Sequence, residues 1–337
     1  MINIITRRLP NVCADGPTKV VLNLMKGLDR VGYPYVINKD VGSTRRLWVA
    51  NESLPLRYLP RERPFTVAGP SIWVLPRDIR ESINWDRIVY VQPSPWTRRL
   101  WEFYGFNKCP MVVWPVGIDL GEYRPAQRDP RSRRVVVYHK DRNPQELPRV
   151  ITALANRGLD AVLIMYGRYR QEDFLEAVRS SAFVLWHGAR ESQGLALEEA
   201  LACDVPVLVW DIPRLTDAYG GYEFSHETDC IGVTAAPYFD SRCGIRIVQP
   251  NSIEAAIDEM LDRIGEFEPR AFVSENLSLE RQARAFVALW AGWGLTWEEG
   301  VREQAQCDAP FRLPLRHKYA ALRAKTKRFL SSAWWEP

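Results

Sequence analysis

Residues Ala182–Trp210 read AFVLWHGARESQGLALEEALACDVPVLVW, in which two short apolar runs enclose a segment with helical spacing. Apolar runs of this length predict buried strands at Ala182–Trp186 and Val205–Trp210, with a helix at Leu195–Cys203 between them. Gly194 precedes the helix and permits the tight turn that leads into it. A strand, a helix and a second strand in this order are the repeating unit of a parallel sheet covered by helices.

The same alternation continues on both sides of this stretch. In the C-terminal half, the predicted elements are the strand Val135–Tyr138, the helix Gln145–Asn156, the strand Ala161–Tyr166, the helix Glu172–Arg179, the strand Ile231–Val233 and the helix Ser252–Ile264. In the N-terminal third they are the strand Ile2–Thr6, a helix opened by Pro17, the strands Ser71–Leu75, Arg87–Val91 and Met111–Val116, and the helix Trp96–Tyr104. The pattern predicts an α/β fold with parallel sheets.

Length indicates how these elements are divided. The chain has 337 residues, more than one hydrophobic core usually holds, so two domains are expected. The polar segment Gly121–Arg134, rich in Pro, Arg and Asp, is the best candidate for a linker. We predict Rossmann-like domains at residues 1–121 and 122–286, with C-terminal helices and a basic tail at 287–337, the helices returning toward the first domain. Because such folds bind ligands at the carboxyl ends of their strands, the two domains should enclose a cleft.

Composition excludes several classes of protein. With 46% apolar and 26% charged residues, the chain can bury a large core and is not disordered. Residues 311–337 carry seven Lys/Arg and one Glu, a net charge of +6. The whole chain has a net charge of +4, so the rest of it sums to −2. The main part of the chain is therefore not a basic protein of the kind that binds nucleic acid. The six cysteines lie far apart, without zinc spacing. With no signal peptide and no apolar run of about 18 residues, we expect a cytoplasmic protein that does not span a membrane.

The predicted helix start at Leu195 is suited to a diphosphate. The backbone amides of Leu195 and Ala196 lack partners inside the helix and lie at the positive end of its dipole. Glu199 lies about one turn inside and leans back toward the N-terminus, where it could accept hydrogen bonds from a ribose. Glu191 lies outside the helix and is placed for the hydroxyls of a sugar. Glu198 points about 100° away from Glu199 around the helix, and we expect it to be solvated.

The order and spacing of these residues resemble a known enzyme family. Glu191 and Glu199, with seven residues between them, resemble the EX7E signature of the GT4-like retaining glycosyltransferases (glycosyl transferases group 1). The flanking residues Ala200, Ala202 and Val205-Pro206-Val207 are similar too, as are Val116-Gly-Ile-Asp119 between the domains and Gly16-Pro-Thr-Lys-Val-Val at the first helix. The resemblance covers about Ile2 to Trp293. It implies the GT-B architecture, a nucleotide-sugar donor held mainly by the C-terminal domain, an acceptor on the N-terminal side, and transfer with retained anomeric configuration.

The resemblance also implies roles for single residues. Glu191 would contact the donor sugar in catalysis, and Glu199 the ribose. The family supplies an Arg and a Lys after the first strand of its second domain, and Lys140 and Arg142 stand there, where they would neutralise the leaving diphosphate. Their spacing departs from the family's Arg-x5-Lys, so the division of labour between them stays open, and a surface turn with solvated charges is the alternative.

Other candidates lie at the predicted edges of the strands. Gly16 would let the backbone approach the donor phosphate or the acceptor, and Asp15 beside it is either an acceptor contact or, more simply, a helix N-cap. Tyr169 would stack on the nucleobase or close a strand–helix turn. His187 would approach the donor or act as a capping or core-edge histidine. Trp96, in Ser94-Pro-Trp96, belongs either to an acceptor site or to a packed helix start.

The expected ligands follow from these residues. No Asp-x-Asp pair follows an apolar strand, so we predict no metal ion. We expect no cofactor beyond the donor and, because the chain outside the tail is not basic, no nucleic acid. The acceptor would be a hydroxyl of a glycan or of a lipid-linked molecule. The basic tail, with Trp334-Trp335 at its end, would bind an anionic membrane surface or pack on the protein. Two other functions are open on the same fold: a non-catalytic nucleotide-sugar or carbohydrate-binding module, and a sugar epimerase.

Overall fold

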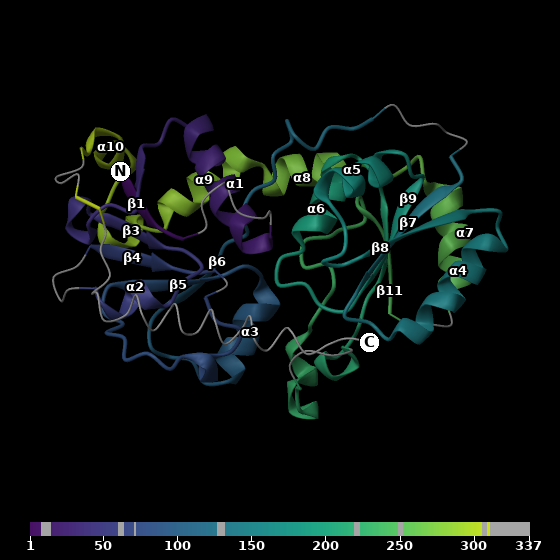
Figure 1. Ribbon diagram of the computed structural model, residues 1–337, viewed down its shortest axis with the longest axis horizontal. Helices are drawn as coiled ribbons and strands as arrows, with labels where there is room; N and C mark the ends of the chain where they lie inside the picture. Colours follow the sequence, from purple (N-terminus) through teal and green to yellow (C-terminus); the bar gives the residue numbers. More distant parts are fainter. Residues whose placement is uncertain are drawn as a thin grey trace.

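The computed structural model describes residues 1–7, 15–59, 64–70, 72–126, 132–218, 223–248, 252–304 and 309–310. These residues form two parallel β-sheets, each flanked by helices, which lie side by side in Figure 1. The predicted α/β class with two Rossmann-like domains is therefore confirmed. The basic tail at residues 311–337 lies outside the described residues, as do Cys13, Cys307 and residues 127–131 of the predicted linker.

The first domain contains a six-stranded sheet in the order β2-β1-β3-β4-β5-β6. Its strands are β1 (Ile2–Ile5), β2 (Tyr35–Ile37), β3 (Arg46–Val49), β4 (Phe65–Ala68), β5 (Ile88–Gln92) and β6 (Met111–Val113), and its helices are α1 (Gly16–Arg30), α2 (Leu54–Arg57) and α3 (Pro95–Phe103). All neighbouring strands are parallel. Their carboxyl ends therefore share one edge, beyond which α1 and α3 begin.

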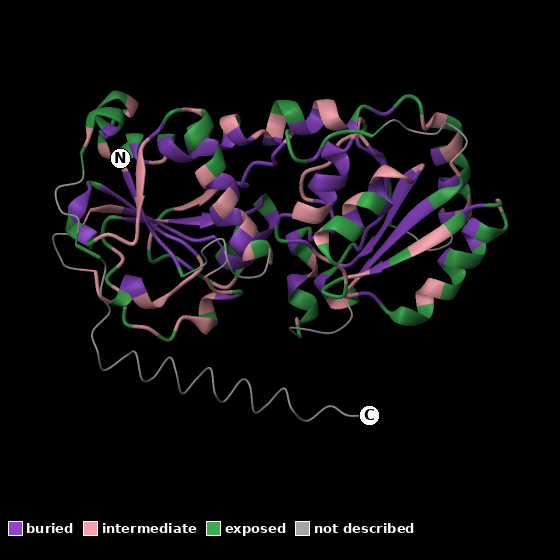
Figure 2. Ribbon diagram, turned by 45° about the horizontal axis from the view of Figure 1, so that its top comes forward, coloured by how far each residue is buried: buried purple, intermediate pink, exposed green. Residues whose placement is uncertain are grey.

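The second domain contains a five-stranded parallel sheet in the order β11-β10-β9-β7-β8. Its strands are β7 (Arg134–Lys140), β8 (Asp160–Met165), β9 (Phe183–Gly188), β10 (Val207–Trp210) and β11 (Gly244–Ile247), and its helices are α4 (Leu147–Ala155), α5 (Gln171–Arg179), α6 (Leu195–Ala202) and α7 (Ile253–Arg263). Every residue of β9 and β10 is buried, and Figure 2 shows the central strands of both sheets as buried. Burial on both faces explains their continuous apolar runs.

Two of the predicted strands are wrong. The described part of Ser71–Leu75 is a loop, and Ile231–Val233 contains the end of a 3-10 helix, η5 (His226–Ile231), and the loop after it. Apolar side chains of both segments pack instead around Trp96 and Leu100 of α3 in one buried cluster. A short apolar run alone does not distinguish a strand from a loop buried against a helix.

Two helices carry the chain from the second domain back to the first. α8 (Pro269–Leu277) and α9 (Leu279–Ala288) follow one another across the top of Figure 1, and α10 (Trp297–Arg302) lies beside the first sheet. Apolar residues of α9 belong to the core of the first domain, where the helix packs on α1. The boundary that we placed at residue 286 falls inside α9.

Close backbone contacts hold the crossing between the domains. A Cβ atom on Gly117 would lie 2.6 Å from Leu279 Cα, and one on Gly27 would lie 2.7 Å from the Leu279 carbonyl oxygen, so both positions exclude a side chain. Asn23 Nδ2 of α1 donates to the Gly117 carbonyl at 2.8 Å. Asp119, two residues farther along, pairs with basic side chains of α1. The connecting segment is therefore anchored to α1.

Candidate functional site

A cavity of about 640 Å³ lies between the two domains. Its walls come from the start of α1 and from the loops after the carboxyl ends of β7, β8 and β9. Seven of the ten residues predicted for the site line it: Gly16, Lys140, Tyr169, Glu191, Gly194, Leu195 and Ala196. The interdomain cleft expected from the sequence is present, and most of its predicted residues lie in it.

Helix α6 begins at the wall of this cavity. Gly194, its N-cap, has a φ angle of +101°, a left-handed conformation in which any side chain would be strained. No side chain caps the helix, because glycine has none. The first backbone amides of α6, at Leu195 and Ala196 of the cavity wall, thus have no acceptor within the helix and can bind an anion.

Glu191 and Lys140 form an ion pair at the same wall. Lys140 Nζ lies 2.7 Å from Glu191 Oε2 and 4.3 Å from the centre of the Tyr166 ring. Burial alone would lower the pKa of Lys140, but the Glu191 carboxylate beside it raises that pKa above its usual value. The backbone of Glu191 is held by the second domain through Thr234 and by the first through Trp96, whose Nε1 donates to the Glu191 carbonyl at 2.8 Å. Burial raises the pKa of Glu191, an effect that Lys140 opposes, so the site holds a protonated lysine beside a buried acidic side chain in a fixed position.

Glu199 lies directly behind the cavity wall and is fully buried. Its Oε1 accepts from Lys19 Nζ at 2.6 Å, and its Oε2 accepts from Gln171 Nε2 at 2.9 Å. Lys19 also donates to Gln171 Oε1 at 2.9 Å. Lys19 and Gln171 line the cavity, and sequence reasoning did not single out either of them. The sequence signals for Lys19 are a cation in the first turn of the helix after the first strand and its place in the segment Gly16-Pro-Thr-Lys-Val-Val.

Glu198 is not solvated as we expected; it is fully buried. Its Oε2 accepts from Gln193 Nε2 at 2.8 Å, and Gln193 also exchanges two hydrogen bonds with the backbone of Val116 in the connecting segment. Burial raises the pKa of Glu198 well above the usual value of 4.5. The expectation failed because α6 has no exposed face beyond its first turn: residues 197–202 are all buried, with the sheet and α8 packed against the helix.

Arg142 and His187 do not line the cavity. Arg142 donates from Nε to Glu146 Oε2 at 3.1 Å, and its guanidinium lies 4.8 Å from the centre of the Trp210 ring. His187 is fully buried, 2.9 Å from the same Glu146 oxygen and 3.0 Å from His139 Nδ1. Burial, with Arg142 nearby, lowers the pKa of His187 to about 3. Of the two cations predicted for the diphosphate, the structure places only Lys140 at the cavity.

The remaining candidates lie at the ends of helices α1 and α3 and in the loop after β8. Asp15 caps α1, with its Oδ1 accepting from Thr18 N at 2.9 Å, which confirms the capping role. Gly16 follows at the cavity wall. Tyr169 lines the cavity and meets Tyr138 edge-on, with ring centres 6.1 Å apart, so its own ring is held in place. Trp96 is buried, in keeping with a packed helix start.

Two further properties bear on function. Within the described ranges, no group of three or more His, Cys, Asp or Glu side chains could hold a metal ion. Among the helices that the structure describes, none is long and apolar enough to cross a membrane.

No protein-family model and no curated protein matches this chain. Solved structures do match it. Sucrose-phosphate synthase from Thermosynechococcus elongatus superposes with a TM-score of 0.51 and 14% identity, over 87% of this chain and 98% of that one. Anabaena HepE, solved in complex with UDP and glucose, superposes with a TM-score of 0.51 and 12% identity, over 86% and 99%.

The fold is GT-B. Identities this low establish the architecture and not the reaction. Within this fold, the cavity at the start of α6 lies in the cleft between the two domains. The second domain contributes Lys140, Glu191 and Glu199 to the site, and the first domain contributes Lys19.

Proposed function

We infer that this chain is a glycosyltransferase that moves a sugar from a nucleoside-diphosphate donor to a hydroxyl acceptor, with retention and without a metal ion. The observation that carries this proposal is the Lys140–Glu191 ion pair beside the uncapped start of α6 in the interdomain cavity. It combines a cation and free amides for a diphosphate with a carboxylate for a sugar. The GT-B fold, shared with a sucrose-phosphate synthase, supports this reading.

The donor would lie along the wall formed by the second domain. Its diphosphate would accept hydrogen bonds from the amides at Leu195 and Ala196, with Lys140 neutralising its charge. Its ribose would lie against Lys19 and Gln171 of the cavity wall, which hold the buried Glu199 carboxylate behind them, and would reach that carboxylate there. Tyr169 is placed to stack on the base. The complex of HepE with UDP and glucose supports a donor of this class.

The mechanism that we propose is front-face substitution. The bond between the anomeric carbon and the phosphate oxygen breaks, and the acceptor oxygen bonds to the anomeric carbon on the same face. The departing phosphate takes the acceptor's proton. Lys140 stabilises the negative charge that develops on the phosphate. Glu191, held by Lys140, orients the sugar hydroxyls and is not required as a covalent nucleophile.

A donor screen followed by an acceptor screen tests the proposal. UDP-, GDP-, ADP- and TDP-sugars would be tested by thermal shift, and the best donor would then be offered to glycan and glycolipid acceptors. We expect one base to raise Tm and one acceptor to be glycosylated, with the donor's anomeric configuration seen in the product by NMR. Binding without turnover would indicate a binding module, conversion without an acceptor an epimerase, and the opposite anomer an inverting enzyme.

A further inference from the structure

A second cavity of about 330 Å³ adjoins the first. The two cavities share Pro93, Lys140 and Ser192 in their walls, so the second one opens beside the Lys140–Glu191 pair. Its volume is at the lower end of the range for sites of small organic ligands. A molecule bound there would lie next to the proposed position of the donor sugar.

The walls of this cavity are mainly apolar. The segment after β4 contributes Ile72, Trp73 and Val74, and α3 contributes Trp96 and Leu100. Val74 is 52% exposed, so its side chain is open to a ligand. Aromatic stacking makes the wall rigid, because Trp73 and Trp101 both stack on Tyr90, with ring centres 6.0 and 4.5 Å from it.

One polar group in this wall has no partner. Gln92, the last residue of β5, is 4% exposed, and its side-chain amide nitrogen makes no hydrogen bond to the residues that the structure describes. A buried donor without an acceptor costs free energy, so buried amides normally have a partner. Gln92 lines the cavity, and a small turn of its side chain would bring the buried amide nitrogen to a ligand oxygen, which would supply the missing acceptor.

We propose that this second cavity binds the acceptor and selects a hydroxyl carried next to a compact apolar or aromatic group. This inference rests on the proposed transfer reaction. The amide of Gln92 donates to an oxygen of the acceptor, while the apolar group packs on Val74 and Leu100 and the reacting hydroxyl faces Lys140. Asp141, Arg190 and Ser192 also line the cavity and can hydrogen-bond polar groups of the acceptor. A wholly polar oligosaccharide fits less well, because hydroxyls placed against Val74 and Leu100 would lose water without gaining hydrogen bonds.

The test compares three glycosides of one sugar with methyl, phenyl and octyl groups. Binding to the full chain is measured by saturation-transfer NMR, with donor binding measured separately by thermal shift. We expect the phenyl glycoside to bind about tenfold more tightly than the methyl glycoside, as burial of its ring predicts. Weaker binding of the octyl than of the phenyl glycoside would support a compact group. Equal or tighter binding of the octyl glycoside would contradict it, because an eight-carbon chain is not compact.

Two variants locate the effect. Val74→Asp should remove the preference for the phenyl glycoside, whereas Val301→Asp, the same change at a 43% exposed position on α10, should leave it intact. Gln92→Leu should weaken all three glycosides severalfold while the Tm shift caused by the donor stays the same.

Three results would separate the hypotheses. Donor turnover with equal use of the methyl and phenyl glycosides, unchanged in Val74→Asp, would overturn the acceptor inference and leave the proposed function standing. Binding of the phenyl glycoside without any donor binding would overturn both, because the cavity would then hold something other than an acceptor. Donor turnover with a preference lost only in Val74→Asp would support both.

Discussion

Lys19 Nζ of the first domain lies 2.6 Å from Glu199 Oε1 of the second. The lysine side chain is 14% exposed and the glutamate is fully buried, so the pair is largely withdrawn from solvent. The carboxylate involved is the one that we expect to hold the donor's ribose. The same contact therefore joins the two domains at the proposed ribose site.

Lys19 and Glu199 should be strongly coupled in stability. Lys19→Met leaves a buried carboxylate without its cation, which costs about 3 kcal/mol in the free energy of unfolding. A double-mutant cycle with Glu199→Gln, measured by urea unfolding, should give a coupling energy of about 1–3 kcal/mol. The exposed pair Arg98–Glu102 on α3 is the control, with about 0.5 kcal/mol or less. Equal coupling in the two cycles would contradict the buried interdomain role.

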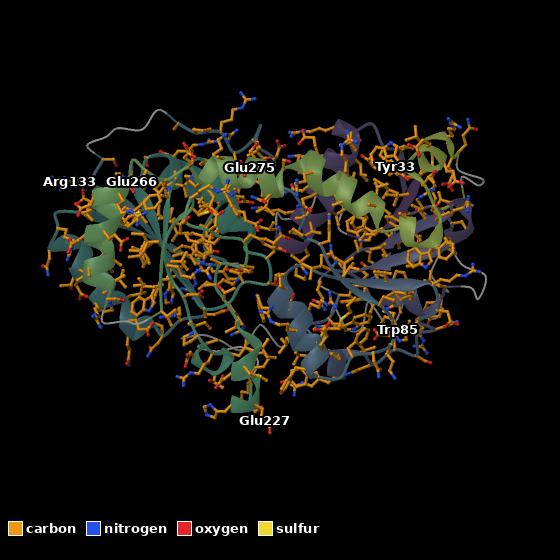
Figure 3. All side chains as sticks on the ribbon, turned by 180° about the vertical axis from the view of Figure 1, so that it is seen from behind. Tyr33, Trp85, Arg133, Glu227, Glu266 and Glu275 are labelled. Carbon is orange, nitrogen blue, oxygen red and sulfur yellow. The ribbon has the colours of Figure 1, made fainter. Side chains whose placement is uncertain are left out.

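Glu199→Gln should weaken donor binding. A hydrogen bond to a charged group contributes about 1.5–3 kcal/mol, which corresponds to about a 10- to 150-fold rise in the donor's Kd. Isothermal titration calorimetry with the best donor measures it. Glu227→Gln is the matched control, since Figure 3 shows Glu227 at the outer tip of a segment that projects from the second domain. A donor Kd within twofold of that of the unmodified chain would contradict a role for Glu199 in binding the ribose.

Lys140 and Arg142 should differ in what they affect. Lys140→Met removes the cation at the cavity and should lower kcat about 100-fold or more while donor binding persists. Arg142→Met breaks contacts with Glu146 and Trp210 away from the cavity, so it should lower Tm more than kcat. Steady-state kinetics and thermal unfolding of both variants decide the assignment. A larger kcat loss in Arg142→Met would return the phosphate role to that residue.

Glu198 should make stability fall as pH rises. Because its pKa is raised by burial in the folded chain, its contribution to stability is complete below the usual value of 4.5 and is lost as pH rises toward the folded pKa. Glu198→Gln keeps an acceptor for Gln193 and removes the titration. Urea unfolding at pH 5 to 8 should show the variant gaining on the unmodified chain by at most about 1.4 kcal/mol per pH unit. If the free energies of unfolding of the variant and the unmodified chain changed in parallel with pH, a raised pKa of Glu198 would be contradicted. Glu227→Gln is the control for the loss of one exposed carboxylate.

Transfer should not need a divalent cation. We expect Lys140 and the first amides of α6 to supply the positive charge that a diphosphate requires. Activity after treatment with EDTA should stay within about twofold of the untreated protein, consistent with charge stabilisation by protein groups alone. A loss restored by Mg²⁺ or Mn²⁺ would contradict metal independence.

Much of the site could be predicted because it depends on short sequence distances. Glu191, Gly194 and Leu195 stand within one strand–loop–helix unit, whose geometry follows from an apolar run, a glycine and a helical pattern. The pairing of Lys19 with Glu199 joins residues 180 positions apart and has no local signal. The second cavity likewise depends on the segment with Ile72, Trp73 and Val74, which we predicted as a strand and which is a loop.

The sequence by itself determined the α/β class, the parallel strands, the glycine at the start of α6 and the edge of the sheet where the site lies. These follow from periodicity and from the backbone freedom of glycine, which act over a few residues. Only the tertiary structure decided that Glu198 is buried, that Arg142 turns toward Trp210 and that Lys19 reaches Glu199. A side chain's partners depend on which elements pack together, and that packing is set by the whole core.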